Sequence, residues 1–284
     1  RICIFNLMIV AVLGSLMRFK IAFEFPFFVQ KNLLHSHSHF ALFGWISFIL
    51  MILIANNLGD TISEKDTKQF RIIFIGSLIC AYGMLISFAL QGYGLFSIFF
   101  STLSILLSFT FGGLYYKTTR SLENTVSRKW FLVVGLIIHH LEIAKIYIKH
   151  EKIIFRTLAI SCVPTYGLSV LWLDLPIWIF LLVIIGTTLQ LLGSYRLVSG
   201  IISKKIISNL KLNLTTKILF GISGMAFSLK ILLQTFSTVP AISKLAFGFR
   251  PIVIAYLHLV LLGLFTLFIL GFLITEGYIR YSKL

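Results

Sequence analysis

Three histidines at alternate positions open an apolar segment, and their type and spacing give the clearest prediction of chemistry in the chain. They are His35, His37 and His39, in the stretch HSHSHFALFGW. On a helix, His35 and His39 are four residues apart and share a face, whereas His37 points nearly the opposite way. A single histidine here would be explained by contact with lipid headgroups. Three together favour a ligand site, because burying imidazoles without partners is costly.

A second informative position lies near the other end of the sequence. His258 lies in the last apolar segment, eight residues after Arg250. The cationic Arg250 is placed to contact either an anionic group of a cofactor or the lipid headgroups. Lys230 lies inside another apolar segment, where a charged side chain is by default functional or paired. Three roles of Lys230 stay open: its ammonium group contacts an anionic group of a cofactor, it takes part in a proton path, or it extends to the membrane surface.

The elements that carry these residues are predicted to be membrane-spanning helices. Hydrophobic residues make up 58% of the 284 residues and charged residues 12%, about half the charged share of a soluble domain. This composition excludes a soluble globule, a disulfide scaffold and a disordered chain. Inside lipid, backbone N–H and C=O groups must form hydrogen bonds with one another, because no water is present. We therefore predict an all-α, polytopic transmembrane helical bundle that forms one domain over 1–284. No internal repeat is evident. Eight segments have spanning length: 2–17, 40–54, 72–90, 95–115, 153–173, 177–198, 218–239 and 252–274.

The segment 130–149 decides the topology. It begins apolar but then carries His139, His140 and further charged groups, which are costly at membrane depth. If it does not span, 19 of the 25 lysines and arginines lie on one side and five on the other, with Lys230 inside a span. Such an excess marks the cytoplasmic side, and it disappears if the segment spans. We therefore predict eight spans, both termini in the cytoplasm, and 130–149 as a re-entrant or interfacial helix. The net charge of +16 then needs no nucleic-acid partner.

This topology places His39 and His258 at a similar depth below the outer surface. At a rise of 1.5 Å per residue, His258 lies about 12 Å below Arg250 and His39 lies about 9 Å below Leu33. Two imidazoles at one depth on two helices suit a low-spin haem, whose propionates need cations at the surface. The sequence thus predicts a haem held by His258 and by His39 or His35, with Arg250 and Lys230 as further cofactor contacts.

The same residues resemble subunit I of the haem–copper oxidase superfamily, which includes nitric oxide reductases. The histidine-rich entry with its FGW sequence, and YLHLV at 256–260, resemble the haem-binding second helix and the His-x-His helix of that family. Small bacterial subunit-I-like membrane proteins are similar also at 162–172 and 247–251. The resemblance implies a haem protein of the bacterial inner membrane that carries electrons in a respiratory-type complex. Its implied partners are the lipid bilayer, further oxidase-type subunits, and cytochrome c or quinol.

The chain also departs from the family. In the family the first histidine of His-x-His binds a high-spin haem and the second a low-spin haem; here Tyr256 takes the first place and His258 keeps the second. The family's copper site needs further histidines. His139 and His140 form an adjacent pair, but their flanks match nothing in the family, and we interpret them as a solvated cytoplasmic pair. Copper ligation by this pair or by His37 is the lesser expectation. The family has more spans, as if a middle section were missing here.

Two functional interpretations stay open. In the first, the protein binds one low-spin haem and passes electrons without reducing oxygen itself. In the second, it is a non-redox transporter or accessory protein for haem or copper, whose outer histidine cluster captures a metal. Full oxidase activity would need a binuclear centre whose ligands are not evident in this sequence.

Overall fold

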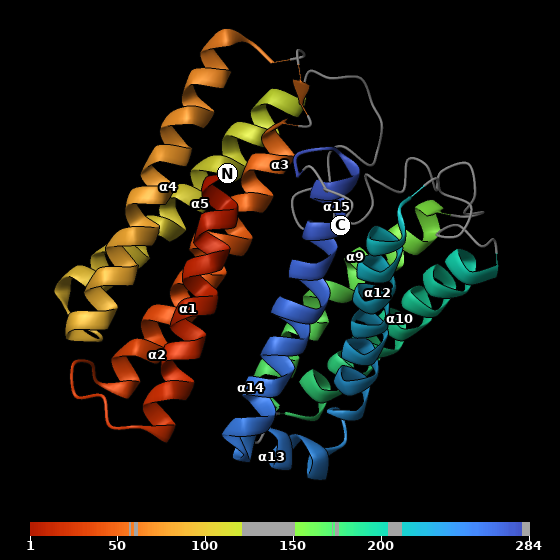
Figure 1. Ribbon diagram of the computed structural model, residues 1–284. Coiled ribbons are helices and arrows are strands. Elements are labelled where there is room, and N and C mark those ends of the chain that lie inside the picture. Colours follow the sequence, from red (N-terminus) through yellow and green to blue (C-terminus); the bar gives the residue numbers. More distant parts are fainter. Residues whose placement is uncertain are drawn as a thin grey trace. The chain divides into compact units, whose positions relative to one another are not determined.

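The protein is described here by a computed structural model. The residues that the structure describes are 1–56, 58–59, 62–120, 151–171, 173, 176–203 and 212–279. Every regular element assigned within them is a helix. The chain divides into two compact units, Arg1–His139 and His140–Leu284, and each unit is described by itself (Figure 1). One domain over 1–284 stays a prediction.

Seven helices within the described residues are long and apolar enough to cross a membrane. They correspond to seven of the eight expected segments, and so confirm a polytopic helical membrane protein. The total number of spans and the side on which the termini lie stay predictions. The seven helices are Ile2–Ala22, Gln30–Asn56, Glu64–Gln91, Leu95–Thr119, Ile177–Ser203, Leu214–Phe236 and Arg250–Thr275.

The eighth expected span, 153–173, takes a different form. It contains the α-helix α9 (Glu151–Thr165), which passes directly into the 3-10 helix η3 (Tyr166–Val170). Pro164 lies inside α9, and because proline has no N–H and its ring clashes with the preceding turn, it disturbs α-helical bonding. The α-helical pattern ends one residue later. The segment 130–149, with His139 and His140, lies outside the described residues.

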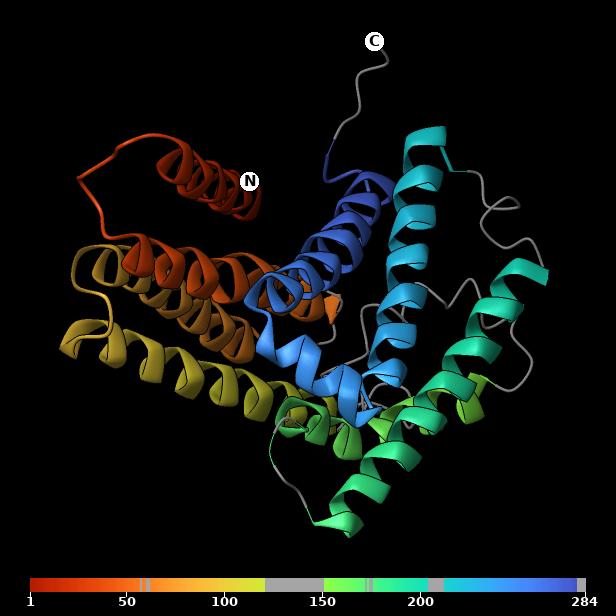
Figure 2. The ribbon, with the colours of Figure 1, turned by 90° about the horizontal axis from the view of Figure 1, so that it is seen from below.

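Unit 1 is built around one long helix with a π-helical centre. This helix, α2–η1–α3, packs against α1 and against α4, and α4 packs along α5 (Figures 1 and 2). The Ser63 hydroxyl caps the start of α4 by accepting from the Asp66 N–H, and Gly92, with φ of +65°, ends it. The elements of this unit are α1 (Ile2–Ala22), α2 (Gln30–His39), η1 (Phe40–Ser47), α3 (Phe48–Asn56), α4 (Glu64–Gln91) and α5 (Leu95–Arg120).

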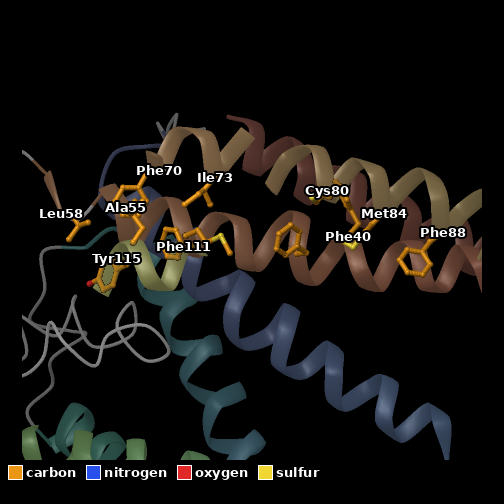
Figure 3. Close-up of a cluster of buried hydrophobic side chains, with 14 residues drawn as sticks. Phe40, Ala55, Leu58, Phe70, Ile73, Cys80, Met84, Phe88, Phe111 and Tyr115 are labelled. Carbon is orange, nitrogen blue, oxygen red and sulfur yellow. The ribbon is translucent and has the colours of Figure 1, made fainter. Parts of the chain in front are cut away.

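The core of unit 1 lies where the long helix, α4 and α5 meet (Figure 3). Phe40, Cys80 and Phe88 are completely buried in it. On the outer faces, large apolar side chains such as Leu95 and Phe109 are exposed, which suits a surface that contacts lipid. The core side chains are Phe40, Phe43, Met51, Ala55, Leu58, Phe70, Ile73, Cys80, Ala81, Met84, Phe88, Phe111, Leu114 and Tyr115.

Unit 2 follows a simple order in which helices next to one another in the sequence pack together. α9 packs on α10, α10 on α12, and α12 on the long helix α14–η4–α15. Gly186 of α10 lets α9 approach closely, since a Cβ there would lie 2.6 Å from Cγ of Pro164. The remaining elements of unit 2 are α10 (Ile177–Ser203), α12 (Leu214–Phe236), α13 (Pro240–Gly248), α14 (Arg250–His258), η4 (Leu259–Thr266) and α15 (Leu267–Thr275).

Candidate functional site

The three clustered histidines lie in the last two turns of α2 and face two different neighbours. The rings of His35 and His39 lie against Phe88 of α4 and against Tyr93. His37 faces α1, where a Cβ on Gly14 would lie 3.4 Å from Cε1 of His37. The helical spacing predicted this division. It leaves His35 and His39 together on one face and separates His37 from them.

Aromatic contacts fix the orientation of the His39 imidazole. The ring stacks on Phe88, with centroids 4.2 Å apart and planes 9° apart. Its Nε2 lies 3.4 Å from the Tyr93 hydroxyl oxygen, at the weak end of hydrogen-bond distances. The His35 ring meets the edge of Tyr93 with centroids 4.7 Å apart. His39 is half-buried, so its ring is held by protein on one side and is not enclosed.

Tyr93 is a residue of this cluster that the sequence analysis did not single out. It lies in the short Gly92–Gly94 connection between α4 and α5, and its side chain is exposed. A close contact between Gly92 and the Asn32 side chain, which a Cβ on Gly92 would meet at 2.5 Å, brings this turn against α2. The feature of the sequence that could have pointed to Tyr93 is a tyrosine in a tight turn directly after α4, at the end of α4 that lies beside the histidines.

His258 is the last residue of α14 and is exposed in unit 2. Its Nδ1 lies 2.8 Å from the backbone carbonyl oxygen of Ile254, one turn earlier in the same helix. A carbonyl oxygen can only accept, so Nδ1 carries the proton and donates it. In the neutral imidazole this tautomer leaves Nε2 as the nitrogen with a free lone pair. A metal-binding histidine commonly uses this arrangement, because the hydrogen bond fixes both the tautomer and the ring orientation.

The two candidate cations belong to the same unit as His258. Arg250 is the exposed first residue of α14, two turns before His258. Lys230 lies half-buried on α12, which packs against α10 and against the helix that carries His258. The structure thus brings Arg250 and His258 onto one helix. His39 and His35 belong to unit 1, so their joint use with His258 stays a prediction.

The donor set can also be judged by what different ligands require. Among the described residues, no three His, Cys, Asp or Glu side chains gather into a group that could hold a metal ion. A haem brings four pyrrole nitrogens of its own and takes only its axial ligands from the protein. Single imidazoles with a fixed ring and an available Nε2, such as that of His258, therefore fit a haem iron.

The comparisons with known proteins add no relative. The sequence matches no family model, no curated protein and no solved structure.

Proposed function

We propose that this chain is a haem-binding membrane protein in which His258 and His39 would hold one low-spin haem. When bound, the haem would supply a one-electron couple, which suits electron transfer. The imidazoles of the two residues would bind the iron, and the apolar helices would exclude water from it. Arg250 and Lys230 supply positive charge for the propionates. His35, on the same helix face as His39, is the alternative ligand from unit 1.

The observation that carries the proposal is the hydrogen bond from Nδ1 of His258 to the Ile254 carbonyl, 2.8 Å long. It makes Nε2 the free donor atom and fixes its direction relative to α14. Because the side chain is exposed in unit 2, a ligand can reach that nitrogen. His39 adds a second imidazole whose plane is held by Phe88.

The topology and setting belong to the same proposal. Eight spans with both termini in the cytoplasm put the histidines near the outer surface of a bacterial inner membrane. The resemblance to oxidase subunit I favours a place in a respiratory-type complex, with further subunits and with cytochrome c or quinol as the electron donor. Seven apolar helices of spanning length support the membrane part of this proposal.

Replacing each ligand by glycine tests the proposal, because added imidazole can then take the place of the missing side chain. His258→Gly and His39→Gly should each lower haem affinity at least about a hundredfold, more than loss of an outer-shell partner costs. Haem titration of the full chain in nanodiscs measures this. Imidazole should restore binding to both variants, which shows that they are folded. His37→Gly, which removes a histidine facing α1, is the matched control and should bind like the wild-type chain. Haem binding that survives both ligand replacements would refute the assignment.

A second candidate function is favoured by the cluster on the other unit. His35 and His39 share a helix face, and the Tyr93 hydroxyl lies 3.4 Å from Nε2 of His39, so these three groups could hold a copper ion for a non-redox transporter or accessory protein. A purified chain without haem that keeps copper, and loses it in His35→Ala, would favour this function over the first.

A further inference from the structure

Each of the two long histidine helices contains a π-helical segment that begins directly after its histidine. η1 follows His39 and η4 follows His258, and both segments are eight residues long. They end in the same way: the N–H of Phe48 bonds to the carbonyl of Phe43, and the N–H of Leu267 to that of Leu262, each five residues back. π-Helical bonding is rare and is frequent at functional sites.

The two segments also share a short sequence pattern that is not evident without the structure. In both, a glycine lies five residues after the histidine and a hydroxyl residue lies eight after it. These are Gly44 and Ser47 in unit 1, and Gly263 and Thr266 in unit 2. Only three positions carry this correspondence within strongly apolar sequence, so it becomes visible only once the π segments are aligned.

A neighbouring helix donates a side-chain hydrogen bond to a backbone carbonyl of each π segment. Asn6 of α1 donates from Nδ2 to the Gly44 oxygen over 2.6 Å. Ser223 of α12 donates from Oγ to the Leu264 oxygen over 2.9 Å. Both donors are buried, and inside a membrane no water replaces them. The acceptors, Gly44 and Leu264, lie five and six residues after the respective histidines, so the two bonds enter the two segments one position apart.

The glycines of the pattern bring small residues of a neighbouring helix close to each segment. A Cβ on Gly44 would lie 3.3 Å from Cβ of Ala81, and a Cβ on Gly263 would lie 3.3 Å from Cβ of Ala226. Close backbone approach of this kind is what lets a buried side chain such as Ser223 reach a helix carbonyl. In unit 2 the contact and the hydrogen bond come from the same helix, α12. In unit 1 the contact is with α4 and the hydrogen bond comes from α1.

We infer that the chain contains a duplicated ligand-presenting element, and that Asn6 and Ser223 are its positioning residues. Each donor stabilises the π-helical hydrogen bonding of its segment. In a π-helix the N–H bonds to the carbonyl five residues back, one residue further than in an α-helix. A return to α bonding would rotate the histidine by about 100° relative to the helix that follows. Asn6 and Ser223 thus set where His39 and His258 point. The ligand role of these histidines rests on the proposed function; the hydrogen-bonded element does not.

The test replaces each donor residue and compares the variant with a control variant at a neighbouring residue. Asn6→Leu keeps the side-chain shape and loses both the Nδ2 donor to Gly44 and the oxygen that accepts from the Tyr82 hydroxyl, whereas Tyr82→Phe loses only the second bond. The difference between these two variants therefore measures the Asn6 donor. Ser223→Ala loses the donor in unit 2, and Ser223→Thr restores a hydroxyl. Ser228→Ala on the same helix is the control, because Ser228 bonds only within its own helix, to the Gly224 oxygen.

Hydrogen–deuterium exchange of the full chain in nanodiscs gives a readout that needs no haem. Amides of 40–47 should exchange about tenfold faster in Asn6→Leu, and those of 259–266 about tenfold faster in Ser223→Ala, as expected for a lost buried hydrogen bond. Tyr82→Phe, Ser228→Ala and Ser223→Thr should exchange like the wild-type chain. Unchanged exchange in both donor variants, or equal acceleration in the controls, would overturn the inference.

Electron paramagnetic resonance of the haem-loaded chain then tests the positioning role. The g-values of a low-spin ferric haem depend on the orientation of its imidazole planes, so Asn6→Leu and Ser223→Ala should shift them while haem content stays the same. Identical g-values in both variants would overturn the positioning role. A wild-type chain that takes up no haem would instead refute the proposed function, and the exchange measurement would still decide whether the element exists.

Discussion

An imidazole binds a metal through the ring nitrogen that its hydrogen bonds leave unprotonated. For His258 the structure identifies that nitrogen as Nε2, because Nδ1 donates to the Ile254 carbonyl. For His39 the corresponding atom lies near a hydroxyl group, and the ring is instead held by stacking on Phe88. The two candidate ligands are therefore oriented by different means, one by its own helix and one by a neighbouring helix.

Tyr93→Phe separates the two candidate functions. The hydroxyl of Tyr93 lies 3.4 Å from Nε2 of His39, and so long a hydrogen bond contributes at most about 1 kcal/mol. Haem affinity should therefore change by less than about fivefold. If the cluster holds copper through this oxygen, copper should be lost. Parallel titrations with haem and with Cu²⁺ measure both, and a large loss of haem affinity would show that Tyr93 has a direct part in the haem site.

Sequence alone could place the histidines on helices but could not give their neighbours. The four-residue spacing of His35 and His39 predicted their common face, and that face is the one beside Phe88 and Tyr93. Tyr93 was missed because the contact depends on how the turn after α4 folds back on α2. The tautomer of His258 could not be predicted either, because it depends on the hydrogen bond to the Ile254 carbonyl, which is known only from the structure.

The existence of the helices was easier to predict than their boundaries or their type: the segment predicted at 40–54 belongs to a helix that begins at Gln30, and the one predicted at 72–90 to a helix that begins at Glu64. Seven segments chosen for their apolar length correspond to helices of the structure. The π segments η1 and η4 escaped prediction, because a run of apolar residues looks the same in α and π bonding and the deciding donors, Asn6 and Ser223, lie on other helices. Pro164 is the opposite case, because a proline can be recognised in the sequence, its missing N–H disturbs α-helical bonding, and α9 ends one residue later.

Gly186→Ala tests the packing of α9 on α10. The new Cβ would lie 2.6 Å from Cγ of Pro164 and 3.3 Å from the backbone nitrogen of Thr165, and a rigid ring and a backbone atom cannot easily move away. We expect a loss of about 1–3 kcal/mol in the free energy of unfolding, as for other overpacked sites. Gly221→Ala is the control, because nothing lies within 4 Å of a Cβ there. Denaturant unfolding in detergent measures both, and equal stability of the two variants would contradict this packing.

For the molecule as a whole, the orientation in the membrane is predicted from the distribution of lysines and arginines, because the helices themselves do not show which end is cytoplasmic. The basic residues are divided 19 to five between the two sides only if 130–149 does not span, and the side with more of them is expected to be the cytoplasmic one. That assignment puts the end of α10 in the cytoplasm and the turn before α13 outside. Both places lie in described residues of unit 2, so the orientation can be tested there without reference to 130–149.

Cysteine labelling at these two places tests the orientation. In a chain whose three native cysteines are replaced by serine, Ser203→Cys marks the end of α10 and Val239→Cys the residue before α13; both positions are exposed. A membrane-impermeant maleimide added to intact cells should label Val239→Cys and should label Ser203→Cys only after lysis. Each variant is the control for the other. Labelling of Ser203→Cys in intact cells would contradict the eight-span orientation.

The visible spectrum of the purified chain after reduction with dithionite decides whether His258 and His39 hold one haem. We expect sharp α-bands of a low-spin haem, absent in His258→Ala and in His39→Ala and unaffected by carbon monoxide, because the two imidazoles would leave it no free coordination site. A colourless protein, or a spectrum that persists in His258→Ala, would contradict it.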